Sequence, residues 1–131
     1  MSKPVILCVD DEPIVLESLR SQLREAFGEC YIYEVAQDAD DALEVIDEIQ
    51  AECTDIILIV SDWLMPGMKG DEFLIKVHQR FPHVVKIMLT GQADEAAIQR
   101  VQDEANLHKC LFKPWSEIEL ITTIQSGLAQ L

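Results

Sequence analysis

Basic residues are scarce in this sequence. Its 131 residues include 10 lysines and arginines against 24 aspartates and glutamates, which gives a formal net charge of −14 at pH 7. A chain of this charge is repelled by the phosphate backbone of nucleic acids and by anionic membrane surfaces. We therefore expect no direct contact of this domain with nucleic acid or membrane, and expect proteins or cations as its partners.

Long apolar runs are also absent from the N-terminal end. Only the five apolar residues Val5–Val9 precede Asp10, which is too few for the core of a signal peptide or for a membrane span. We therefore expect a cytoplasmic protein. The sequence also lacks internal repeats and linkers rich in Pro, Gly or Ser, so residues 1–131 are expected to form one domain.

Cysteine motifs are missing as well. No two cysteines have C-x-x-C spacing and none has a companion histidine, which argues against a zinc site or a disulfide framework. We expect all four to be buried, reduced thiols: Cys8, Cys30, Cys53 and Cys110.

What the sequence does contain is a fivefold alternation of strand-like and helix-like patterns. Strands are predicted near 4–9, 31–36, 55–61, 84–89 and 109–112, and the runs at 5–9 and 56–60 are apolar throughout, as in strands covered on both faces. This alternation is typical of a doubly wound α/β fold with a parallel sheet and helices on both faces.

Apolar spacing and capping residues place the helices. The first is predicted over 13–27, the second after a cap at Asp38, and the third from Asp71 to just before Pro82. The fourth is expected at about 92–105, and the fifth from Trp115 to the end of the chain.

Polar side chains stand where four of the predicted strands end: Asp10 and Asp11, Asp62, Thr90, and Lys113. The carboxyl ends of parallel strands share one edge of the sheet, so these side chains should converge on one crevice. Three adjacent carboxylates repel one another unless a cation neutralises them, and Mg²⁺ is the usual ion where phosphoryl groups are handled. The alternative, that Asp10 and Asp11 only place negative charge at a helix N-terminus, does not account for Asp62 and Lys113.

These residue types suit metal-assisted phosphate chemistry. A carboxylate such as Asp62 can accept a phosphoryl group in line and form an aspartyl phosphate. Lys113 would pair with one phosphoryl oxygen, and the Thr90 hydroxyl would bond another.

Four segments in this order resemble the receiver domain of two-component response regulators, along the whole length of the chain. They are Val9–Pro13, Ser61–Gly70, Leu89–Gly91 and Phe112–Pro114. The resemblance implies a flavodoxin-like (βα)5 sandwich with strand order 2-1-3-4-5. It also implies that the phosphohistidine of a sensor histidine kinase or phosphotransfer protein phosphorylates Asp62. Mg²⁺ would be held by Asp11, Asp62 and the backbone carbonyl of Leu64, with Asp10 acting mainly through metal-bound water.

One position departs from the family pattern. Receivers of this kind usually carry Tyr or Phe three residues before the lysine, and its rotamer accompanies the Thr movement on phosphorylation. Here that switch position is Cys110. The aromatic half of the Tyr/Thr switch is therefore absent, and we expect only Thr90 and Lys113 to move the segment that follows Thr90.

Two other functions are weighed against this one. A haloacid-dehalogenase-like phosphatase would use Asp10 as nucleophile and Glu12 as acid/base, but that class carries Asp at the second position and a flexible flap where Pro13 opens a helix. A receiver-like docking module that takes no phosphate would be expected to have lost at least one site residue. On the receiver interpretation the domain is not an enzyme beyond assisting its own phosphorylation and dephosphorylation.

The output surface is expected to comprise the fourth helix, fifth strand and fifth helix. Apolar residues of the fifth helix form a stripe that suits core packing and also a homodimer seam: Ile121, Ile124, Leu128 and Leu131. Because the stripe reaches Leu131, we expect the helix to continue into a linker and an output domain C-terminal to it.

Overall fold

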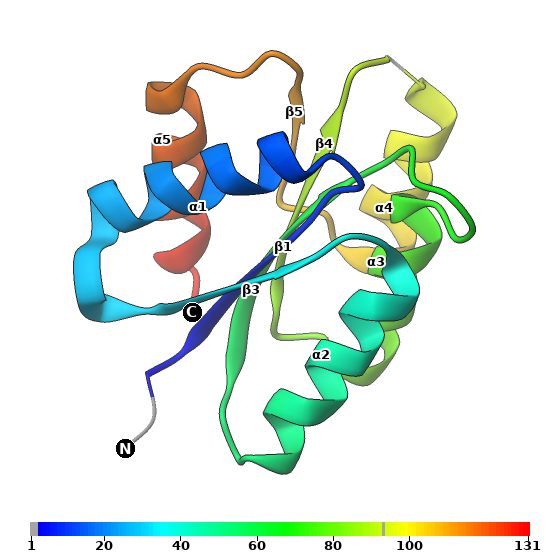
Figure 1. Cartoon of the computed structure of the whole chain (residues 1–131). Helices are drawn as coiled ribbons and strands as arrows, with labels where there is room; N and C mark the ends of the chain where they lie inside the picture. The colour runs from blue at the N-terminus through cyan, green and yellow to red at the C-terminus, as the bar shows by residue number, and fades with distance from the viewer. Residues whose placement is uncertain (1–2, 93) are drawn as a thin grey trace.

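The protein folds as a five-stranded parallel sheet between two layers of helices (Figure 1). The computed structural model describes residues 3–92 and 94–131. Its strands are β1 (Val5–Val9), β2 (Ile32–Ala36), β3 (Ile56–Asp62), β4 (Val85–Thr90) and β5 (Lys109–Phe112). The helices described are α1 (Pro13–Phe27), the 3-10 turn η1 (Gly28–Cys30), α2 (Ala39–Ala51), α3 (Gly70–Arg80), α4 (Glu95–Ala105) and α5 (Glu117–Leu128).

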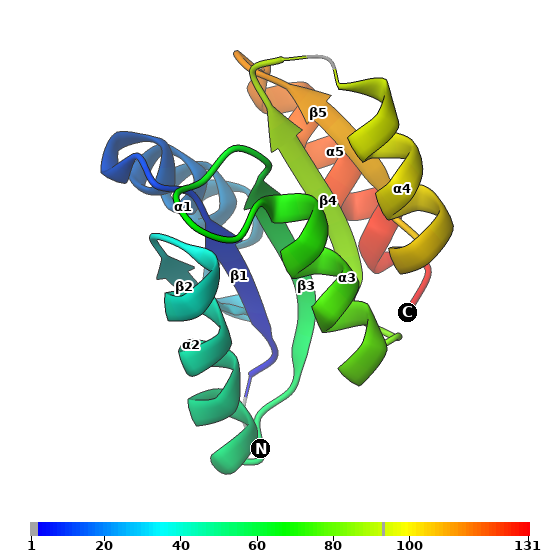
Figure 2. The same cartoon turned by 90° about the vertical axis from the view of Figure 1, so that its right-hand side faces the viewer.

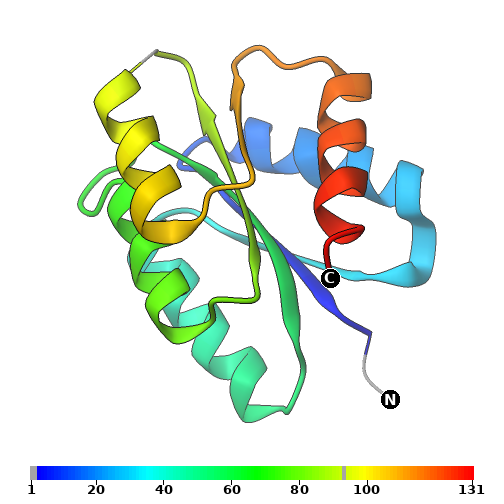
Figure 3. The ribbon, with the colours of Figure 1, turned by 180° about the vertical axis from the view of Figure 1, so that it is seen from behind.

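The sheet order is β2-β1-β3-β4-β5, with all neighbouring strands parallel. This confirms the predicted doubly wound, flavodoxin-like α/β fold and its strand order. Helices α1 and α5 cover one face of the sheet, and α2, α3 and α4 cover the other, as the views in Figures 1 and 3 show.

Successive side chains of the central strands point to opposite faces of the sheet, so each strand contributes to the hydrophobic core on both faces. In β1, Val5, Leu7 and Val9 face the α2–α3–α4 layer, whereas Ile6 and Cys8 face the α1–α5 layer. All five side chains are buried, which is why the strand reads as a continuous apolar run.

Side-chain caps determine where α4 and α5 begin. The Asp94 carboxylate accepts a hydrogen bond from the Ala97 backbone N–H, so α4 begins at Glu95 and not near 92. The Ser116 hydroxyl accepts one from the Glu119 N–H, and α5 therefore starts at Glu117, two residues later than predicted. Its end at Leu128 also corrects the expectation of a helix to the last residue.

The apolar stripe of α5 serves mainly the core. Ile124 is fully buried, Ile121 and Leu128 are half-buried against the α1–α5 layer, and Leu131 lies exposed beyond the helix. This burial favours the core interpretation over the homodimer seam. No helix among the residues described is both long and apolar enough to span a membrane.

The expectation of four buried thiols was wrong for two of them. Cys8 is buried in β1 and Cys110 is half-buried, but Cys30 and Cys53 are exposed. Cys30 belongs to the short η1 turn, and Cys53 has a positive φ of 57° in the turn between α2 and β3. These two thiols are exposed because they lie in surface turns and not within strands.

Candidate functional site

Strand register brings the predicted polar residues to one edge of the sheet. Val9 pairs with Ser61, Asp62 with Leu89, and Thr90 with Phe112, so β1, β3, β4 and β5 end at the same level. The Lys113 backbone N–H donates to the Thr90 carbonyl at 2.8 Å. Of the predicted site residues, Asp11, Asp62, Leu64, Thr90 and Lys113 line one cavity at this edge, and Gln92 joins them.

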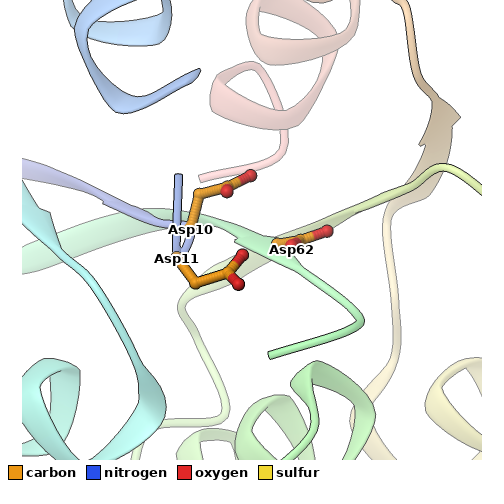
Figure 4. A group of neighbouring side chains, drawn as sticks. All are labelled: Asp10, Asp11 and Asp62. Atoms are coloured by element: carbon orange, nitrogen blue, oxygen red, sulfur yellow. The ribbon is translucent and has the colours of Figure 1, made fainter. Parts of the chain in front are cut away.

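Three carboxylates form the centre of the site. Figure 4 shows Asp10 and Asp11 just after β1, beside Asp62 at the end of β3. One carboxylate oxygen from each lies within 4.8 Å of the others, and Asp10 is fully buried, Asp62 buried and Asp11 exposed. Mg²⁺ takes oxygen ligands at about 2.0–2.1 Å in an octahedron, so two ligands on opposite sides lie about 4 Å apart. This donor set therefore fits a hard divalent cation.

Lys113 holds the buried part of this cluster together. Its ammonium donates to Asp10 Oδ2 at 2.8 Å and lies 3.3 Å from Asp62 Oδ1. The other Asp10 oxygen, Oδ1, accepts the Glu12 backbone N–H at 2.9 Å. Both Asp10 oxygens thus have protein partners, which leaves Asp11 and Asp62 as the better placed carboxylates for direct contact with a cation.

Burial and neighbouring charge change the acidity of these groups. Burial, followed by the negative charge of Asp10, raises the pKa of Asp62 to about 6, although Lys113 opposes the increase. Burial by itself would lower the pKa of Lys113, but its hydrogen bond to Asp10 and the charge of Asp62 outweigh burial and raise it. The charged form of Asp62 is therefore destabilised at this edge, and a bound cation would stabilise it.

The loop that follows Asp62 returns onto the Asp62 backbone at Gly70. The Gly70 N–H donates to the Trp63 carbonyl at 2.7 Å, and the Ser61 hydroxyl donates to the Asp62 carbonyl at 2.9 Å. A Cβ atom on Gly70 would lie only 2.0 Å from the Asp62 carbonyl oxygen, so only glycine fits there. Gly70 is a positioning residue that the sequence pattern did not reveal, although a glycine between the loop after Asp62 and a predicted helix was a sign of close packing.

Thr90 lies beside the carboxylates but is bonded to the following loop. Its hydroxyl donates to the Gln92 carbonyl and accepts the Gln92 N–H at 3.0 Å. Cys110, at the switch position, is half-buried against the α2–α3–α4 core, and burial raises the pKa of its thiol. Cys110 is not among the residues that line the cavity.

The two tryptophans differ in burial. Trp63 is buried, with Lys69 Nζ 5.3 Å from its ring centroid. Trp115 is half-buried and donates its Nε1–H to Gln22 Oε1 at 2.9 Å. Trp63 packs with the α2–α3–α4 core because its backbone continues β3 by donating to the Leu89 carbonyl.

The acidic, lysine-paired cluster lies at the carboxyl edge of a doubly wound sheet, which is where open α/β folds bind their ligands. Comparison with known proteins identifies the family. The model of the response regulator receiver domain matches residues 6–125, and the chain belongs to this family of two-component signalling domains. The family match does not favour the phosphatase alternative.

Relatives in sequence are longer regulators. The hydrogenase transcriptional regulatory protein HoxA of Cupriavidus necator is 31% identical over 123 residues, which cover 94% of this chain and 24% of that protein. The DNA-binding transcriptional regulator NtrC of Escherichia coli K12 is 27% identical over 130 residues, covering 98% of this chain and 26% of NtrC. The chain thus spans about a quarter of the length of these two relatives.

Solved structures give the same result. The signal receiver domain of an HD domain-containing protein from Pseudomonas fluorescens Pf-5 superposes with a TM-score of 0.87 at 29% identity, covering 98% of this chain and 96% of that one. A CheY-like receiver domain from Methanospirillum hungatei gives a TM-score of 0.85 at 29% identity, with the same coverage of both chains.

Proposed function

We propose that residues 1–131 form one receiver domain that accepts a phosphoryl group on Asp62 from the phosphohistidine of a sensor histidine kinase or phosphotransfer protein. An Asp62 oxygen forms the new bond to phosphorus while the bond from phosphorus to the imidazole nitrogen breaks. The imidazole leaves with that electron pair. The observation that carries this proposal is the contact of Lys113 with both Asp62 and Asp10 beside Asp11, in a chain of the receiver family.

Each site residue has a distinct part in the proposal. Asp11 and Asp62 would hold Mg²⁺ directly, together with the Leu64 carbonyl, and Asp10 would support it through water. Mg²⁺, when bound, supplies positive charge that neutralises the carboxylates and the incoming phosphoryl oxygens. Lys113, already directed at Asp62, binds one of those oxygens, and Thr90 binds another after breaking its bond to Gln92.

Exposed apolar residues next to the site support a protein as phosphodonor. Ile14 and Ile118, each 81% exposed, lie in the first turns of α1 and α5, which both start at the carboxyl edge of the sheet. We propose that these two side chains contact the protein that donates the phosphoryl group. The phosphorylated domain then acts through its α4, β5 and α5 surface on a partner or on an attached output domain.

Intact mass tests the acceptor assignment. The parent, Asp62→Asn and Asp10→Asn chains are incubated with a small phosphodonor and Mg²⁺. We expect one phosphoryl group on the parent, slower labelling of Asp10→Asn because metal support is lost, and none on Asp62→Asn.

The same experiment separates the alternatives. Label that persists in Asp62→Asn but disappears in Asp10→Asn would support the phosphatase with Asp10 as nucleophile. A parent that takes no label from the small donor or from a histidine kinase would support the docking module.

A further inference from the structure

An ion pair links the start of α3 to the middle of α4. Arg100 Nη1 of α4 lies 3.5 Å from Asp71 Oδ2, and the Asp71 side chain is only 11% exposed. Arg100 also pairs with Glu104 on its own helix at 3.2 Å. Among the ion pairs of residues 3–92 and 94–131, this is the one that joins α3 to α4.

Asp71 follows directly on the residue that contacts the phosphoacceptor backbone. Gly70 rests against the Asp62 carbonyl with no room for a Cβ, and its N–H is bonded to the Trp63 carbonyl. Atoms packed this closely move together, because no space is left between them. A shift of the Asp62 backbone must therefore move the first turn of α3, and Asp71 with it.

Helices α3 and α4 lie side by side along the sheet (Figure 2). Phe73 and Val77 of α3 share one core with Val101 and Ala105 of α4, and all four are buried. This apolar contact holds the helices together but is nondirectional. The Asp71–Arg100 pair adds a directional link at the end of α3 nearest Asp62.

We infer that the Asp71–Arg100 ion pair couples the phosphoacceptor loop to α4. The inference rests on the proposed phosphorylation of Asp62. It gives the signal a path through Gly70 and Asp71 that does not require an aromatic residue at position 110. Asp71 and Arg100 are positioning residues in this scheme, and neither contacts the phosphoryl group.

Hydrogen exchange of α4 tests the coupling. Exchange of the Glu95–Ala105 amides is measured with and without Mg²⁺ and beryllofluoride, a phosphoryl analogue, in the parent, Asp71→Asn, Arg100→Gln and the double variant. We expect the ligand-induced change of the parent to fall to about half or less in each single variant. The double variant should lose no more than either single one, because the two side chains act as one unit.

Two controls remove other ion pairs. Asp47→Asn breaks the cross-helix pair of Asp47 with Arg80, which joins α2 to α3 at 2.9 Å far from the site, and Glu104→Gln removes the other partner of Arg100. Both should keep the parental response. All variants should take a phosphoryl group on Asp62 to the parental extent, as judged by intact mass.

Each contrary result has a distinct meaning. A parental α4 response in Asp71→Asn and Arg100→Gln, or losses that add in the double variant, overturns the coupling while Asp62 labelling stands. A parent that is labelled but whose α4 exchange does not change also overturns it. A parent that takes no label overturns the proposed function, and the coupling with it.

Discussion

Replacing Lys86 with methionine is expected to stabilise the fold at neutral pH. Lys86 lies in β4, is 1% exposed, and donates its ammonium to the Val84 carbonyl. None of the carboxylates of the described residues forms an ion pair with it. A buried ammonium with one neutral partner is costly, because it loses water without gaining an opposite charge.

The pKa of Lys86 gives the size of this cost. Burial lowers the pKa of Lys86 from its ordinary value of 10.5 to about 8. The difference corresponds to about 3 kcal/mol of unfavourable free energy for the charged form in the folded state. Methionine removes that cost but also the hydrogen bond to Val84, worth about 2 kcal/mol because its donor is charged. We expect Lys86→Met to raise the free energy of unfolding by about 1 kcal/mol at pH 7.

The pH dependence of this gain has a definite sign. Between pH 8 and pH 10.5 the unfolded chain keeps a proton on Lys86 that the folded chain has released. The free energy of unfolding of the parent therefore rises with pH across this window, relative to Lys86→Met. The advantage of the variant should be complete below pH 8 and shrink towards pH 10.5.

Urea unfolding at a series of pH values measures this difference. Comparing parent with variant cancels the titration of the cysteines and tyrosines, and Lys76→Met, on the exposed side of α3, is the matched control with no expected gain. A stabilisation that is constant from pH 7 to pH 10, or a variant less stable than the parent at pH 7, would show that burial of the Lys86 ammonium is not costly.

Two further predictions concern the site itself. Gly70→Ala should lower the free energy of unfolding by about 1–3 kcal/mol and slow labelling of Asp62, because its Cβ would press on the Asp62 carbonyl. Urea unfolding measures the first effect and intact mass the second. Parental values for both would contradict the close approach of Gly70 to Asp62. Millimolar Mg²⁺ should raise the melting temperature of the parent and change Trp63 fluorescence. Both responses should weaken in Asp11→Asn, which lacks one carboxylate of the site. Equal responses in the two chains would place the ion elsewhere.

The sequence was sufficient to predict the strands and the meeting of the site residues. Continuous apolar runs such as Val5–Val9 mark central strands, and parallel pairing forces their carboxyl ends to one edge. It could therefore be predicted that residues at the strand ends lie close together in space, namely Asp10, Asp62, Thr90 and Lys113.

Contacts that depend on the path of a loop could not be predicted in this way. The approach of Gly70 to Asp62 requires the return of the seven-residue loop between β3 and α3, and the Asp71–Arg100 pair joins side chains 29 positions apart on two helices. Burial of Trp63 and exposure of Cys30 also follow from local backbone geometry that apolar spacing does not encode. Lys86 illustrates the same limit, because an apolar run around it indicated a buried strand but not whether its ammonium had a partner.

The two links to α4 bear on how a receiver without an aromatic residue at position 110 could signal. To bond a phosphoryl oxygen, the Thr90 hydroxyl must give up the Gln92 carbonyl, and Gln92 lies in the segment that leads to α4. Arg100 connects the same helix to Asp71 at a separate point. Because Val101 is fully buried against the sheet and α3, α4 should respond to both inputs as one body. Cys110 need not change rotamer in this scheme, since neither link passes through its side chain.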